Sequence, residues 1–144
     1  MHTLKDYICT ILGIIGTAIA TWFGGWTTAM GTLLLFMAID FVTGLIVAGV
    51  FKKSAKTKTG ALESKQSWKG LCRKGMTLLF VLIGHRMDIA LGVSYIKNAV
   101  CIGFIANELI SIAENAGLMG VPLPNILKKA IEVLKEESEN TEEN

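Results

Sequence analysis

Four long apolar stretches alternate with short polar segments along the chain. A helix that crosses the hydrocarbon core of a bilayer needs about 20 mostly apolar residues. The pattern therefore predicts an all-α protein whose membrane-spanning helices cover residues 7–23, 28–51, 75–95 and 98–118. Only a few residues join the first span to the second and the third to the fourth, so we expect antiparallel neighbours in a helical bundle.

Ionisable groups interrupt the last two of these stretches. The predicted third span carries His85, Arg86 and Asp88, and the fourth carries Glu108 and Glu114. Such groups near a helix centre cost several kcal/mol to insert. Either partners inside the protein compensate them, or these segments lie partly at the membrane interface and the chain has fewer than four true spans.

The first stretch also has features of a secretory leader, because residues 18–20 fit a small-x-small cleavage pattern. However, Asp6 follows Lys5 directly, so the leading segment has little positive charge. The apolar run also continues through Trp22. A retained first helix is the better interpretation.

The segment at 52–74 between the second and third spans is strongly basic. Its acidic residue is Glu63, and its basic residues are Lys52, Lys53, Lys56, Lys58, Lys65, Lys69, Arg73 and Lys74. Short basic loops stay on the cytoplasmic side, so four spans place both termini in the cytoplasm. Within this loop, residues 65–74 are predicted to form an interfacial helix with Trp68 facing lipid, and the lysines should attract anionic headgroups. This role explains the basic cluster without a nucleic-acid partner.

Residues 1–118 thus form a predicted transmembrane domain, and residues 119–144 form a cytoplasmic tail. Prolines 122 and 124 end the fourth helix and favour a new start. An apolar stripe at helical spacing predicts an amphipathic helix over 124–137, which lies on the membrane or against another subunit. The stripe consists of Ile126, Leu127, Ala130, Ile131 and Leu134. The acidic residues 136–144 are predicted to be disordered.

Composition supports the membrane assignment and argues against an enzyme. Half of the residues are apolar and only 18% are charged, with a formal net charge of +2. The sequence contains no HExxH, GxSxG or phosphate-loop motif. Cys9, Cys72 and Cys101 form no CxxC pair and are interpreted as small packing residues. We therefore expect no catalytic site, no metal and no cofactor.

Polar residues of the fourth span fall within one sector of the helix at about 100° per residue. They are Asn107, Glu108, Ser111, Glu114 and Asn115. Because polar groups in lipid would lack hydrogen-bond partners, this sector should face either other helices of a static bundle or a water-filled path.

Two further charges in the predicted spans need partners. Arg86 and Asp88 are two residues apart on one helix, so they point to nearly opposite sides and cannot pair with each other. Asp40 near the middle of the second span and Glu108 near the middle of the fourth lie at a similar depth. Either carboxylate is then a candidate partner for Arg86.

Small residues recur every four positions on the first two spans. One row contains Gly16, Ala20 and Gly24 with Gly13 on the neighbouring row, and another contains Asp40, Gly44 and Ala48. Such rows allow helix backbones to approach closely. They indicate lateral association into a homo-oligomer or close packing within one chain.

The order of these features resembles the phage-lysis and toxin-secretion holin family of Gram-positive bacteria and their phages. The matching pieces are residues 39–44 (IDFVTG), residues 67–75 (SWKGLCRKG), Asp88, residues 107–115 (NELISIAEN) and residues 120–124 (GVPLP). They follow the family order between Ile39 and Lys135, over about two-thirds of the chain. Each piece alone has little specificity, but the ordered set is fairly specific.

The resemblance implies a protein that accumulates in the bacterial cytoplasmic membrane and then oligomerises at a timed moment. The resulting lesion releases a peptidoglycan hydrolase or a toxin, with no cofactor involved. Two other functions fit the sequence: a small ion channel or transporter of fixed stoichiometry, and an antiholin or passive scaffold. The sequence contains no inverted repeat, which argues against the transporter.

Overall fold

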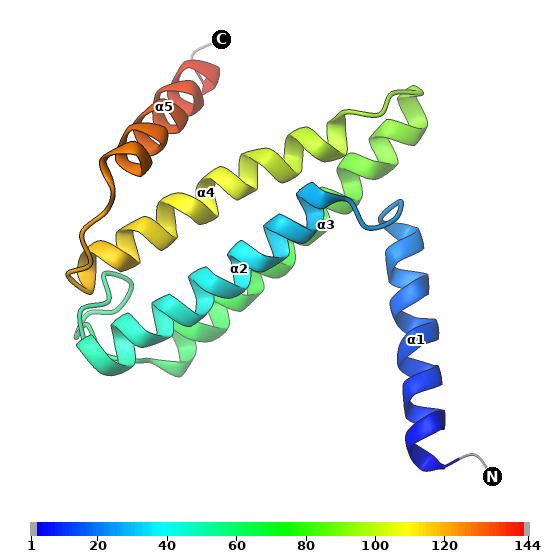
Figure 1. Ribbon diagram of the computed structural model, residues 1–144, viewed down its shortest axis with the longest axis horizontal. Coiled ribbons are helices and arrows are strands. Elements are labelled where there is room, and N and C mark those ends of the chain that lie inside the picture. The colour runs from blue at the N-terminus through cyan, green and yellow to red at the C-terminus, as the bar shows by residue number, and fades with distance from the viewer. Residues whose placement is uncertain (1–2, 143–144) are drawn as a thin grey trace.

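The computed structural model describes residues 3–142, which form helices joined by turns and one longer loop (Figure 1). In chain order these are α1 (Leu4–Trp22), α2 (Thr28–Ile46) with a π-helical turn (Val47–Phe51), α3 (Ser64–Leu91), α4 (Ile96–Leu118) and α5 (Asn125–Glu142). Within the described residues no strand occurs, so the all-α prediction is confirmed.

Three helices are long and apolar enough to cross a membrane: Leu4–Trp22, Thr28–Phe51 and Ile96–Leu118. They agree closely with three of the predicted spans. The remaining predicted span, 75–95, corresponds to α3, which begins earlier, at Ser64, and ends earlier, at Leu91. The predicted interfacial helix at 65–74 is therefore the first part of α3 and continues into the bundle without a break.

Local sequence signals set the helix ends. The Thr27 hydroxyl caps α2 by accepting a hydrogen bond from the backbone N–H of Met30 at 3.2 Å. Gly92 ends α3 in the left-handed conformation, with φ of 66°, which costs glycine little. Gly120 ends the turn after α4 in the same way, with φ of 78°. Pro124 directly precedes α5, which begins at Asn125, one residue after the predicted start at 124.

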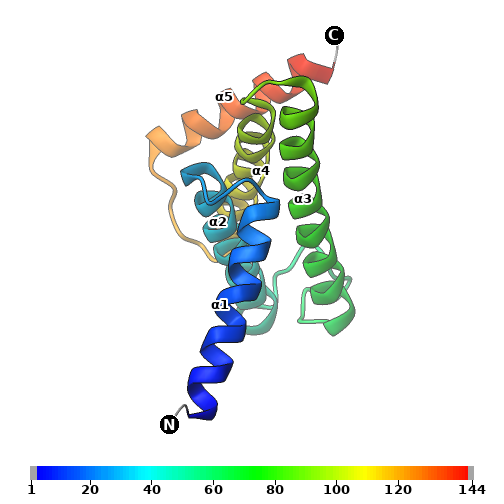
Figure 2. The same ribbon diagram turned by 90° about the vertical axis from the view of Figure 1, so that its right-hand side faces the viewer.

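Helices α2, α3 and α4 form a three-helix bundle in which α4 packs along both of the others (Figures 1 and 2). Helices α2 and α4 run in the same direction and α3 runs opposite to them. We call the end that carries loop residues 52–63 the loop end. The opposite end, with the turns at 23–27 and 92–95, is called the turn end.

An apolar core fills the half of the bundle nearer the turn end. It consists of Met30, Leu33, Met37, Val81 and Cys101. The last of these confirms a packing role for one cysteine, whereas Cys9 and Cys72 are exposed and that prediction fails for them. The other half of the bundle, nearer the loop end, holds polar residues instead.

Helix α1 stands apart from this bundle and contains no buried residue (Figure 1). Its predicted packing glycines Gly13 and Gly16 have no other part of the described chain within contact distance of an added Cβ. In α2, by contrast, Gly44 lies against Asn115 of α4 and Ala48 is buried. The small residues of α2 therefore serve packing within the chain, while those of α1 are uncovered.

Helix α5 is longer than predicted. It begins at Asn125 and continues to Glu142, past the predicted end at 137. The prediction of disorder from 136 onward is thus wrong up to Glu142, since glutamate is a good helix former; residues 143–144 lie outside the described part. In the apolar stripe Ile131 is buried and Ile126 is exposed, while the side chain of Leu134 lies outside the description.

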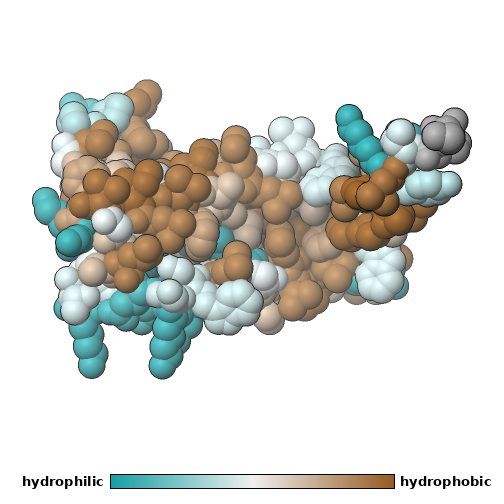
Figure 3. Space-filling view, turned by 90° about the horizontal axis from the view of Figure 1, so that it is seen from below, coloured by the Kyte–Doolittle hydropathy of each residue, from teal (hydrophilic) through white to brown (hydrophobic). Residues whose placement is uncertain are grey.

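The surface divides as expected for a membrane protein. A broad hydrophobic area covers the middle of the bundle, and hydrophilic side chains gather at the loop end (Figure 3). Large apolar residues on all three bundle helices are exposed, among them Leu35, Leu79 and Ile102. Lipid chains would cover such a surface without the cost of exposing it to water.

Candidate functional site: a buried ion-pair cluster

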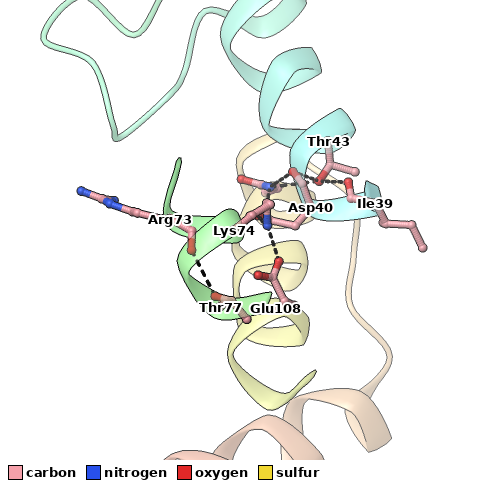
Figure 4. A network of polar contacts seen from close by, with 8 residues as sticks. Ile39, Asp40, Thr43, Arg73, Lys74, Thr77 and Glu108 are labelled. Atoms are coloured by element: carbon pink, nitrogen blue, oxygen red, sulfur yellow. Dashed lines mark hydrogen bonds and ion pairs between the residues drawn. The ribbon is translucent and has the colours of Figure 1, made fainter. Parts of the chain in front are cut away.

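One lysine of α3 joins all three bundle helices. The Lys74 ammonium lies 2.8 Å from a carboxylate oxygen of Asp40 on α2 and 2.5 Å from one of Glu108 on α4 (Figure 4). The three side chains are only 13%, 7% and 13% exposed, respectively. The neighbouring Arg73 points away from them (Figure 4).

Hydrogen bonds extend this arrangement. The Asn115 amide nitrogen donates to the second carboxylate oxygen of Asp40 at 3.2 Å and to the Thr43 hydroxyl at 3.0 Å. We call Asp40, Thr43, Lys74, Glu108 and Asn115 the Lys74 cluster. Asp40 and Thr43 are about one turn apart on α2, and Glu108 and Asn115 are about two turns apart on α4. Each of these helices therefore presents its cluster residues from one face.

The cluster places two carboxylates around a single ammonium in a region where charge is costly. Beside it, toward the loop end, lies a cavity of about 120 Å³. Lys56, Ser111 and Glu114 are among the residues that line this cavity. Lys56 brings a second positive charge toward the Asp40 side of the cluster, while the carboxylates of Glu63 and Glu114 line the same cavity.

The partner predicted for Arg86 is wrong. Asp40 and Glu108 both pair with Lys74 instead. Lys74 precedes Arg86 by twelve residues, which is about 18 Å along a helix. Since α3 ends at Leu91, Arg86 lies near the turn end, far from either carboxylate.

The predicted polar sector of α4 divides between the bundle and its surface. Asn115 is buried, and Glu108 and Ser111 are half-buried toward the cluster and its cavity, whereas Asn107 and Glu114 are exposed. Interhelical hydrogen bonding, one of the two open alternatives, therefore accounts for the inward residues in a single chain.

The basic residues of segment 52–74 lie at the loop end and are exposed, with one exception. The exposed side chains are Lys52, Lys53, Lys56, Lys58, Lys65, Lys69 and Arg73, together with Trp68. The exception is Lys74, predicted as one more surface charge, which lies inside the bundle. Lys74 lies six positions after Trp68, about 120° around the helix at about 100° per residue, so the two side chains do not share a face.

Asp88 acts as a cap between helices. Its carboxylate accepts hydrogen bonds from the backbone N–H groups of Ile96 at 2.8 Å and Lys97 at 3.0 Å, at the start of α4. Those groups have no partner within their own helix, and a negative charge there is favourable. Asp88 thus finds its partner in backbone rather than in a side chain.

Replacing Asp88 by alanine should lower the free energy of unfolding by about 0.5–2 kcal/mol, as for loss of a helix cap. Asp88→Asn keeps one carbonyl acceptor, so its free energy of unfolding should lie between those of Asp88→Ala and the natural protein. Thermal unfolding in detergent, followed by circular dichroism, would measure both. Equal stability of all three proteins would contradict the capping role.

Sequence reasoning missed Lys97 altogether. This residue is 5% exposed, and its ammonium donates to the backbone carbonyls of Phe23 and, at 3.1 Å, Gly25. It therefore ties the end of α1 to the start of α4. The predicted fourth span began at residue 98, so Lys97 fell in the turn; a lysine directly at the start of an apolar helix was the available signal.

Gly24 explains why the chain turns so tightly beside Lys97. It adopts φ of 71°, and a Cβ added there would lie 2.1 Å from Cε1 of His85. Only glycine tolerates both the conformation and the contact. Gly24 therefore serves this turn, rather than the helix-packing row predicted for it.

Among residues 3–142, no group of three or more His, Cys, Asp or Glu side chains is placed to hold a metal ion. The polar contacts described above are the ion pairs and hydrogen bonds of the Lys74 cluster and the contacts of Asp88 and Lys97.

Comparison with known proteins gives a consistent result. A family model described as the bacteriophage holin family matches residues 17–136. An uncharacterized protein of Halalkalibacterium halodurans is 38% identical over 85% of this chain and 89% of its own. A probable holin of Bacillus phage phi105 is 29% identical over 77% of each chain. No solved structure matches significantly.

Proposed function

Because the chain belongs to the bacteriophage holin family, we propose that it permeabilises the cytoplasmic membrane of its bacterial host. It accumulates there, oligomerises and forms lesions through which a peptidoglycan hydrolase, or alternatively a toxin, leaves the cell. The family match over residues 17–136 carries the proposal. The three apolar helices of spanning length support an integral membrane protein.

The bundle supports a four-span topology. Helices α2 and α4 are both candidate spans. Near its start α4 contacts the segment before α2 through Lys97, and near its end Asn115 contacts Asp40, so the two helices run in the same direction. The chain can enter α4 at the turn end only if α3 has crossed back from the loop end. With α1 as a further span, this arrangement supports the proposal that both termini and the basic loop lie in the cytoplasm.

Pairing of charges explains how α3 crosses despite its composition. Lys74 is neutralised by Asp40 and Glu108, and Asp88 is satisfied by backbone N–H groups. Both arrangements lower the cost of placing ionisable groups in a membrane. On the cytoplasmic side, Trp68 and the exposed lysines of α3 and its loop are then positioned for contact with anionic headgroups.

The Lys74 cluster suggests how a harmless monomer becomes a lesion. In the single chain the inward polar residues of α4 are satisfied by α2 and α3. In an oligomer the bundles open, and the polar sector of α4 faces water in the lesion while the uncovered small-residue row of α1 associates with other copies. Such a change requires no catalytic residue and no cofactor.

Inducible expression in a bacterium tests the function. Membrane potential, culture density and leakage of a cytoplasmic reporter protein are followed with and without a co-expressed peptidoglycan hydrolase. We expect a delayed, abrupt loss of potential with release of the reporter, and lysis only when the hydrolase is active. A catalytically inactive hydrolase provides the matched control.

Two other results would each contradict the proposal. Ion flux that grows in proportion to expression and releases no protein would identify a channel or transporter of fixed stoichiometry. High abundance in the membrane without any effect would identify an antiholin or scaffold, and the antiholin would delay lysis by a co-expressed holin.

A further inference from the structure

A crevice of about 500 Å³ lies between the end of α1 and α3, near the turn end. Its lining residues are Thr21, Trp22, Leu82, His85, Arg86 and Ile89. Arg86 is the one arginine or lysine among them, and Leu82 and Ile89 provide apolar walls. The crevice thus combines a fixed positive charge with an apolar surface and an exposed indole.

No partner within the described chain neutralises Arg86. The ion pairs of residues 3–142 both belong to Lys74. The Arg86 side chain is exposed, and large apolar neighbours on α3, Ile83 and Met87, are exposed too. A guanidinium group stays protonated in proteins, so its charge in this apolar surface requires an anion from elsewhere.

A second copy of the chain is a poor source of that anion. Of its twelve acidic residues, Asp88 alone lies toward the turn end, where it is buried and occupied by the start of α4. Asp6 is at the opposite end of α1 from Trp22. Asp40 and Glu108 are held by Lys74. The others belong to the loop end, to the last turns of α4 and to α5 and the residues after it.

We propose that the crevice binds the phosphate group of a phospholipid in the leaflet at the turn end. Arg86 lies six residues before Gly92, about 9 Å along the helix axis, so its long side chain can reach the headgroup level. A guanidinium pairs with two phosphate oxygens at once. The acyl chain follows the apolar wall of Leu82 and Ile89, and Trp22 lies at the interface, where indoles are favoured.

This inference rests on the topology in the proposed function and differs from the headgroup contacts of the basic loop. Those contacts lie in the cytoplasmic leaflet, whereas the Arg86 crevice faces the opposite one. A lipid seated between α1 and α3 would hold α1 beside the bundle. It would therefore help to set how α1 is presented to other copies.

Lipid retention measured by native mass spectrometry tests the site. The full chain is reconstituted in nanodiscs containing phosphatidylglycerol, or containing a digalactosyl diacylglycerol that lacks phosphate, and is then released for measurement. We expect the natural protein to retain one phosphatidylglycerol more than Arg86→Met does, with at least tenfold weaker retention of that lipid in the variant, while lipid held by the basic loop is unchanged. Arg86→Lys, which keeps the charge and loses the two-point contact, should be intermediate.

Arg73→Met is the matched control, because Arg73 is the only other arginine, is exposed and lies on the same helix at the loop end. It should retain the lipid. A variant with Trp22 as its sole tryptophan adds a local readout, since its emission should change with lipid bound at Arg86. Equal retention by Arg86→Met, equal retention of the phosphate-free lipid, or equal loss in Arg73→Met would overturn the site.

Loss of a dimer rather than of lipid in Arg86→Met would identify a second copy as the partner and would also overturn the proposal. These results do not depend on lysis. Phosphate-specific lipid retention without lesions in the expression test would therefore refute the proposed function alone. Lesions without lipid at Arg86 would refute only the lipid site.

Discussion

Replacing Lys74 by methionine should destabilise the bundle by about 3–5 kcal/mol, the cost typical of removing one partner from a buried ion pair. The variant leaves Asp40 and Glu108 without the ammonium that lies 2.8 and 2.5 Å from them. Two carboxylates then share a poorly hydrated site that joins α2 to α4. Denaturant titration of the purified protein in bicelles, followed by circular dichroism, would measure the loss.

Arg73→Met is the control for this prediction as well. It removes the same charge from the adjacent residue, whose side chain points away from the cluster (Figure 4), and should change stability by no more than about 0.5 kcal/mol. A triple variant, Asp40→Asn with Lys74→Met and Glu108→Gln, removes all three charges together and should recover most of the stability. Equal stability of Lys74→Met and Arg73→Met would show that the cluster does not hold the bundle together.

Helices were largely predictable because a bilayer constrains sequence so strongly. An apolar run of about 20 residues has few alternatives to a helix, so the extents of α2 with its π-helical turn and of α4 could be predicted to within about two residues. The short turn after α1 followed from the same runs, whereas the turn that begins at Gly92 falls inside the predicted third span, 75–95. The extent of α3 was not predicted in this way, because its first half is polar. The composition of that half led to its prediction as a separate interfacial helix.

The error over Arg86 arose from this misplaced start. A span beginning at residue 75 puts Arg86 in the middle of the membrane, beside Asp40 and Glu108. A helix from Ser64 to Leu91 shifts the register, so Lys74 takes that depth and Arg86 approaches the turn end. Periodicity gives the direction of a side chain around a helix, whereas its depth depends on where the helix enters the bundle, which only tertiary packing fixes.

The inward face of α4 shows the complementary case, in which sequence was informative. Glu108, Ser111 and Asn115 were grouped by their angular spacing alone, and they do turn toward the bundle or its cavity. Spacing could not identify Lys74 as the donor to this face. Lys74 was counted among the basic residues of the loop that set the topology, and nothing in the sequence distinguished it from them. Sequence therefore predicted the polar face, while the structure is needed to find the cation that neutralises it.

Lys97 provides the second large expected effect, on the position of α1 rather than on the stability of the bundle. Helix α1 has no buried side chain, and Lys97 donates to the carbonyls of Phe23 and Gly25 at its end. Hydrogen bonds to a charged donor contribute about 1.5–3 kcal/mol each. Loss of both in Lys97→Met should shift the equilibrium between docked and free α1 by at least about tenfold.

The natural cysteines allow this shift to be measured. Cys9 on α1 and Cys72 on α3 are exposed and accept spin labels, while the buried Cys101 is protected. Pulsed electron paramagnetic resonance in bilayers should give one narrow distance distribution for the natural protein and for the control Lys128→Met, whose lysine is exposed on α5. Lys97→Met should give a broad distribution, and Lys97→Arg, which still donates to both carbonyls, a narrower one.

The free energy of unfolding of the bundle should change little in Lys97→Met, even though the distance distribution broadens. Methionine removes a buried charge as well as its hydrogen bonds, and the gain from no longer burying that charge offsets part of the loss. Lys74→Met should thus weaken the bundle, whereas Lys97→Met should free α1 from a bundle that stays folded. A narrow distribution in Lys97→Met would mean that contacts such as the close approach of His85 to Gly24 are sufficient to hold α1.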